Sequence, residues 1–99
     1  MPTLVDIVKA YYESRGLVWP NADRALAFLF SEIGELADAH VHGQDRWVRN
    51  DGQKERSIVD EIGDVQMMLT VYAAEHGSDP VGCMLDKMSK KGFMPPSTE

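Results

Sequence analysis

The chain has little that would stabilise a small domain covalently or place it in a membrane. Cys83 is its single cysteine, so no disulfide can form within the chain. No apolar run approaches the length of a membrane span or of a signal-peptide core, which makes a cytoplasmic location the default expectation and argues against a membrane partner. Strand-like alternation of apolar and polar residues is also absent. Helices are therefore the expected elements.

Positive charge is scarce as well. Ten lysines and arginines stand against sixteen acids, which gives a formal net charge of -6 at pH 7. Nucleic-acid polymers and acidic membrane surfaces need clustered positive charge, so neither is an expected partner. An anionic ligand would have to arrive with a metal ion. At 99 residues the chain makes one small domain with a limited core, and self-association is expected.

Two five-residue stretches are nearly identical: residues 32–36 read EIGEL and residues 61–65 read EIGDV. Each copy has two acids three residues apart, a spacing that puts both on one face of a helix. Each copy also keeps a glycine, Gly34 or Gly63, although glycine inside a helix costs about 1 kcal/mol relative to alanine. We therefore expect the partner helix or a ligand to approach the backbone closely there. Two such helices side by side would bring four acids together: Glu32, Glu35, Glu61 and Asp64.

Capping residues divide the chain into four expected helices. Two of these helices open with a Ser or Thr followed three residues later by Asp, as in a capping box, and another with Asp followed by Pro. We expect an all-α, four-helix domain over residues 1–94 that is completed by homo-oligomerisation, a polar loop at 43–56, and a loose tail at 95–99. The expected boundaries are Thr3 to Gly16, Asn21 to His42-Gly43, Ser57 to His76-Gly77, and Asp79 to Gly92.

The third expected helix is apolar on two sides. Met68, Val71 and Tyr72 share the side of Glu61 and Asp64, and a second stripe runs along another side. Carboxylates set into an apolar surface are costly unless a cation pairs with them, although a solvated helix face is the simpler alternative. So much apolar surface also predicts at least a homodimer. The second stripe consists of Ile58, Ile62, Val65 and Leu69.

The type of ligand atom limits which metal ions can be expected to bind. Carboxylate oxygens suit Mg²⁺ or Mn²⁺, and Mg²⁺ is usually bound by a few carboxylates together with substrate phosphates. A phosphorylated substrate is therefore expected. Di-iron helical bundles add a Glu-x-x-His motif, which neither copy of the repeat has.

The order of these motifs is similar to that of a known family. Glu32-x-x-Glu35, a loop, and Glu61-x-x-Asp64 on successive helices, each with glycine before the second acid, resemble the MazG-like all-α nucleoside triphosphate pyrophosphohydrolases. The resemblance covers roughly residues 20–92.

The resemblance implies that these four acids bind Mg²⁺ and form the catalytic centre of a helical dimer or dimer of dimers. It also implies that a nucleoside triphosphate is cleaved between its α and β phosphates. Ser31 stands where the family commonly has the first of two glutamates, and Met68 where it often has an aromatic residue or histidine. Phosphoribosyl-ATP pyrophosphohydrolase belongs to the same superfamily and is an alternative. A non-catalytic helical dimerisation module that binds a structural cation is another.

Other side chains are weaker candidates. The basic ones could contact phosphates, although solvated lysines near a helix C-terminus are the simpler interpretation. Trp19 could stack on a base, although it is more simply a core residue. Cys83 is expected to be a buried thiol, because it lies beside an apolar stripe. The basic candidates are Lys54, Arg56, Lys87 and Lys90.

Overall fold

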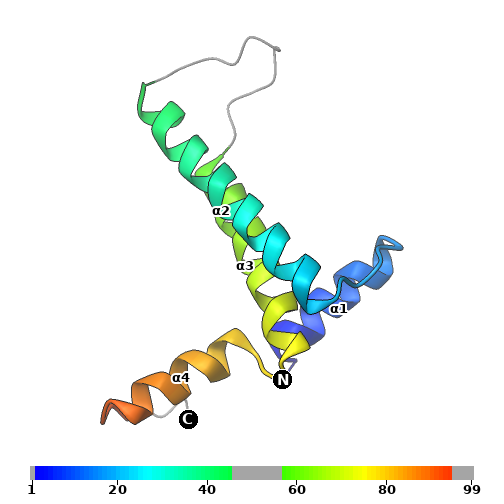
Figure 1. The fold of residues 1–99 in the computed structure, drawn as a ribbon, viewed down its shortest axis with the longest axis vertical. Coiled ribbons are helices and arrows are strands. Elements are labelled where there is room, and N and C mark those ends of the chain that lie inside the picture. Colours follow the sequence, from blue (N-terminus) through cyan, green and yellow to red (C-terminus); the bar gives the residue numbers. More distant parts are fainter. Residues whose placement is uncertain (1, 46–56, 95–99) are drawn as a thin grey trace.

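The computed structural model describes residues 2–45 and 57–94, and of residues 43–45 it describes the backbone only. All regular structure in this part is helical, as expected. Most of the expected polar loop (46–56) and the whole tail (95–99) lie outside the described residues. No described helix combines the length and the apolar character needed to cross a membrane. The helices are α1 (Leu4–Ser14), α2 (Ala22–Asp45), α3 (Ile58–Glu75) and α4 (Pro80–Lys90) (Figure 1).

The helices begin where the capping residues predict. In the capping box of α1, the Thr3 hydroxyl accepts a hydrogen bond from the Asp6 N–H at 3.1 Å, and the Asp6 carboxylate accepts one from the Thr3 N–H at 3.0 Å. Asn21 caps α2 by accepting from the Arg24 N–H at 2.9 Å. Before α3, the Ser57 hydroxyl accepts a longer hydrogen bond, of 3.4 Å, from the Asp60 N–H.

Asp79 caps α4 and also connects two helices. One of its carboxylate oxygens accepts from the Val81 N–H at 2.9 Å, with Pro80 in the first turn. The other accepts from the Val5 N–H at 3.2 Å, which joins the start of α4 to the start of α1. At the other ends of the helices, Gly16 has a φ of 63°, a left-handed conformation that closes α1 as expected. The helix α2 continues two residues beyond the expected end, to Asp45.

The core lies where α1 packs against the long α2–α3 pair. These two helices run side by side in opposite directions, and α1 lies across the end formed by the start of α2 and the end of α3 (Figure 1). Ala25 of α2 and Val71 of α3 are completely buried there. The same cluster contains Val8 and Met68, with Tyr12, Trp19, Leu29, Met67 and Tyr72 half-buried around them.

The helix α4 projects away from the α2–α3 pair (Figure 1). None of its residues is buried. Its predicted apolar stripe is therefore largely exposed within the chain: Val81, Met84 and Met88 are exposed and Leu85 is half-buried.

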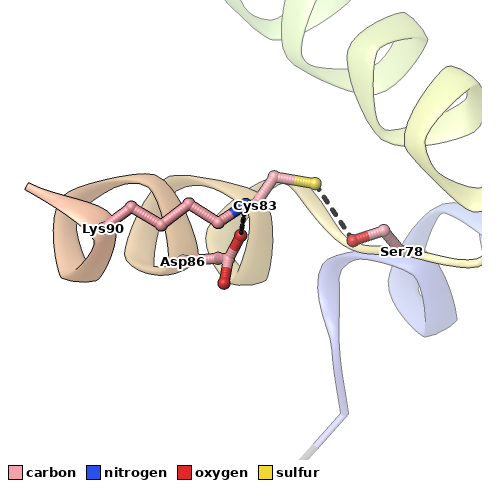
Figure 2. A network of polar contacts seen from close by, with 4 residues as sticks. All are labelled: Ser78, Cys83, Asp86 and Lys90. Atoms are coloured by element: carbon pink, nitrogen blue, oxygen red, sulfur yellow. Dashed lines mark hydrogen bonds and ion pairs between the residues drawn. The ribbon is translucent and has the colours of Figure 1, made fainter.

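This position of α4 corrects the prediction for Cys83. The thiol is exposed rather than buried, because the stripe beside it has no covering surface in the described chain. The Cys83 sulfur lies 3.0 Å from the Ser78 hydroxyl oxygen, and further along α4 an ion pair of 3.0 Å joins Lys90 to Asp86. Figure 2 shows both contacts.

The helical glycines give a second correction. A methyl group added at Gly34 or Gly63 would meet nothing within 4 Å in the described chain. The prediction that the partner helix of the same chain approaches closely at these positions is therefore wrong. Close approach by a ligand stays a prediction.

Candidate metal centre

Three of the four predicted acids meet between α2 and α3. Glu32 comes from the middle of α2, and Glu61 and Asp64 come from the first half of α3. One carboxylate oxygen from each of the three lies within 4.8 Å of the others. Glu61 is only 4% exposed, and Glu32 and Asp64 are half-buried. The antiparallel pairing of the two repeats thus brings the acids together in a protected position.

Glu35 lies beside this group but outside it. It is half-buried one turn after Glu32 on α2, and the two side chains share a hydrogen bond. The close group of three oxygens does not include it. The four predicted acids therefore form one set in which Glu35 is the outer member.

The proton affinity of Glu32 reflects this arrangement. Its pKa is raised from the ordinary 4.5 to about 7, first by burial, then by the hydrogen bond with Glu35, and then by the negative charges of Glu35, Asp64 and Glu61. Its buried Oε2 atom accepts no hydrogen bond from the residues that the structure describes. An acceptor with no donor, among like charges, is a favourable ligand for a cation.

The donor set fits a hard divalent cation. All three ligand atoms are carboxylate oxygens, which Mg²⁺, Mn²⁺ and Ca²⁺ prefer over soft ligands. The span of up to 4.8 Å is slightly wider than about 4.2 Å, the distance between opposite oxygens around an octahedral Mg²⁺.

The described basic candidates, Lys87 and Lys90, do not lie at the acids. Lys54 and Arg56 lie outside the described residues. Lys87 and Lys90 stand in the last turn of α4, which projects away from α2 and α3 (Figure 1), and Lys90 pairs with Asp86. Within one chain, the described part therefore does not bring these two lysines to the acids.

Trp19 lies in the connection between α1 and α2 and packs against the core cluster. Its indole N–H donates to the Glu75 carboxylate at 2.7 Å, and its ring packs edge-on against Tyr12 with centroids 5.0 Å apart. Lys9 lies 5.9 Å from the centre of the ring. Trp19 thus supports Tyr12 from the connection between α1 and α2.

Sequence reasoning missed a small cavity that opens beside the acids. It has a volume of about 190 Å³, and Glu32 and Asp64 form part of its wall. One sign in the sequence could have indicated that α1 forms part of this wall. Val8 and Tyr12 are four residues apart, a spacing typical of a helix face that packs on a core. The remaining lining residues are Tyr11, Tyr12, Leu17, Met67 and Met68.

A larger cavity of about 480 Å³ lies where α3 meets α4. None of its described lining residues is an acid, and they include Leu69, Tyr72, His76 and Cys83. The smaller cavity is the one in contact with the candidate metal ligands, so it is the more relevant to chemistry at the acids.

Comparison of the chain with protein families, with curated proteins and with solved structures finds no match. The function is therefore inferred from the residues of the site and from the resemblance of its motifs.

Proposed function

We propose that this protein is a Mg²⁺-dependent nucleotide pyrophosphohydrolase, which converts a nucleoside triphosphate into nucleoside monophosphate and pyrophosphate, with Mn²⁺ as a substitute metal. The observation that carries the proposal is the burial of Glu61, 4% exposed, against Glu32 and Asp64 within 4.8 Å. Acids on a solvated helix face remain in water, whereas like-charged acids that are enclosed together favour the binding of a cation between them. The resemblance of the two repeats to MazG-like enzymes supports the choice of substrate.

The residues divide into metal ligands and a base. Glu32, Glu61 and Asp64 would hold the cation, which when bound supplies positive charge to the phosphates and lowers the pKa of a bound water. Glu35 is the outer acid, so its carboxylate is the one best placed to orient the attacking water and accept its proton. No covalent nucleophile is required.

Attack at the α phosphorus follows from the family resemblance, since the carboxylates alone do not select a phosphorus atom. The bond between the α phosphorus and the bridging oxygen breaks, and pyrophosphate leaves with that oxygen. The described chain offers few basic side chains near the acids, so the charge of the leaving group has to be neutralised chiefly by metal.

A homo-oligomer, either a dimer or a tetramer, is part of the proposal. Helix faces that the described chain leaves uncovered support it, because Ile62 is 53% exposed on α3 and Phe30 is 68% exposed on α2.

The test is turnover of a nucleotide panel that includes phosphoribosyl-ATP, with and without Mg²⁺. We expect monophosphate and pyrophosphate in equal amounts, only with metal, and ¹⁸O from labelled water in the monophosphate. Label in pyrophosphate, or nucleoside diphosphate with orthophosphate, would contradict the proposed chemistry.

Two other results would assign a different function. Preferential cleavage of phosphoribosyl-ATP would indicate the related pyrophosphohydrolase. If no member of the panel is cleaved while Mg²⁺ still raises the melting temperature, the acids form a structural cation site in a helical dimerisation module.

A further inference from the structure

The small cavity beside the acids has walls that suit a flat aromatic group. Tyr11 and Tyr12 of α1 stand edge-on to each other, with ring centroids 6.3 Å apart and an interplanar angle of 73°. Met67 and Met68 of α3 form another part of the wall, and Leu17 adds an aliphatic surface. Aromatic rings and thioethers both make favourable contacts with the faces and edges of a π system.

The size of the cavity limits what can enter. Its volume is about 190 Å³, whereas pockets that enclose a complete small ligand measure about 300–1,000 Å³. A whole nucleotide is therefore too large, but a single ring fits. Because Glu32 and Asp64 belong to the same wall, a ring in the cavity would place the rest of the ligand at the acids.

The Tyr12 hydroxyl in the wall of the cavity has only a weak hydrogen-bond acceptor. The Tyr12 O–H donates to the Met68 sulfur at 3.6 Å, and a thioether is a poor acceptor. Burial raises the pKa of Tyr12, with a smaller contribution from Tyr11, so the phenol stays protonated and remains a donor at neutral pH. A carbonyl oxygen brought into the cavity would be a better acceptor than the sulfur.

We propose that this cavity is the base subsite of the enzyme and takes a pyrimidine, with the Tyr12 hydroxyl donating to a carbonyl oxygen of the ring. Every common pyrimidine base has a carbonyl at C2, whereas adenine has none and both purines have a second ring. This proposal rests on the proposed function, because it assigns the base of the same nucleotide whose phosphates lie at the acids. Tyr12 is thus a specificity-determining residue.

The test compares pyrimidine and purine nucleoside triphosphates in wild-type protein and in Tyr12→Phe. We expect kcat/KM of the wild-type protein to be about tenfold or more higher for pyrimidine than for purine triphosphates. A loss of this order is usual when a substrate does not fit a specific binding site. Tyr12→Phe should lower kcat/KM for pyrimidines roughly three- to tenfold, the range of one neutral hydrogen bond, mainly by raising KM. kcat/KM for purines should change less, so the preference for pyrimidines should narrow.

Tyr72→Phe is the matched control, because Tyr72 is also half-buried on a helix but lines the other cavity. It should leave kcat/KM unchanged for both pyrimidine and purine triphosphates. A second variant, Leu17→Trp, narrows the cavity at an exposed position, so it should raise KM for pyrimidines without unfolding the chain. Equal turnover of purines and pyrimidines, with no effect of Tyr12→Phe or Leu17→Trp, would overturn the proposal while leaving the pyrophosphohydrolase intact.

Binding is measured separately from turnover. The chain has two tryptophans, Trp19 and Trp47. Trp19 packs on Tyr12, so its fluorescence reports on the cavity once Trp47→Phe has removed the other signal. If no nucleotide is cleaved, the proposed function fails, and the cavity is judged by binding alone. Saturable quenching by pyrimidine nucleotides, but not by inorganic triphosphate, would then support the base subsite, and an unchanged signal would overturn it.

Discussion

Glu61 is a buried acid that lies close to other carboxylates. It is almost completely buried between α2 and α3, and the nearest acids, Glu32 and Asp64, carry charge of the same sign. Like charges at this separation disfavour the folded state, and a divalent cation that binds only the folded state reverses the effect. The metal-free protein is therefore expected to be weakened at this point.

We predict that Glu61→Gln separates stability from activity. Removing one charge should leave the metal-free protein as stable as wild type or more so, and should abolish turnover. Wild-type protein should gain about 2.7 kcal/mol at a hundredfold excess of Mg²⁺ over its Kd, and the variant should gain much less. Thermal melts with and without Mg²⁺ measure this. Asp60→Asn, the exposed neighbour on α3, is the control and should respond to Mg²⁺ like wild type.

The raised pKa of Glu32 predicts a pH dependence. Since its pKa is about 7 in the folded protein and near 4.5 ordinarily, the folded state binds more protons between these values. The free energy of unfolding of metal-free protein should therefore fall as pH rises through this window. Mg²⁺ affinity should rise over the same window, because the ligand must be ionised. Melting and metal titration at several pH values test both slopes.

Glu32→Gln should flatten both of these slopes. A metal-free protein whose stability rises with pH across the window would contradict the assignment to Glu32.

At the scale of single residues, the sequence predicted that the acids meet, but it did not predict the cavity beside them. Two copies of one pattern on paired helices are enough to expect Glu32, Glu61 and Asp64 to meet. The cavity depends on how α1 crosses the end of the pair, which brings Tyr12 to Met68 from 56 residues away. No local spacing indicates that contact, and Met68 alone gave no reason to expect an aromatic ring from another helix.

Among the elements, helix boundaries were the most predictable feature, because each capping residue acts on its own first turn. Asn21 and Asp79 bond N–H groups two or three residues away, so the sequence contains all of the information. The position of α4 was not predictable in this way. Its apolar stripe requires a covering surface, but periodicity does not say which one, and the described chain does not supply it.

The glycines of the two repeats give a prediction for α2 and α3. An added methyl group at Gly63 meets nothing within 4 Å, and alanine is favoured over glycine in a helix by about 1 kcal/mol. Gly63→Ala and Gly34→Ala should therefore each raise the free energy of unfolding by up to about 1 kcal/mol. Urea denaturation at low protein concentration measures this.

Gly77→Ala is the control, and it should lower the free energy of unfolding. The φ angle is 70° there, and alanine is strained in that conformation. Loss of stability in Gly63→Ala would instead indicate that a second copy packs closely on that backbone in solution.

The molecule as a whole is extended for its length. Its Cα radius of gyration is 16.3 Å, whereas a compact domain of this size has a radius of about 13 Å. Much of its apolar surface lies on continuous helix faces: Leu26, Phe30 and Ile33 are exposed at helical spacing on α2, and Ile58, Ile62 and Leu69 on α3. Stable monomers rarely leave so much apolar surface in contact with water.

We predict that the protein self-associates through these faces. Ile62→Glu places a charge in the middle of the α3 stripe, where Ile62 is 53% exposed, so it should disturb an interface but not the core. Light scattering at micromolar concentration should give a dimer or larger species for wild type and an 11.1 kDa monomer for the variant. Val18→Glu is the control, because Val18 is 87% exposed between α1 and α2 and away from both stripes. A wild-type monomer would contradict the prediction, and α4 would then need a partner of another kind.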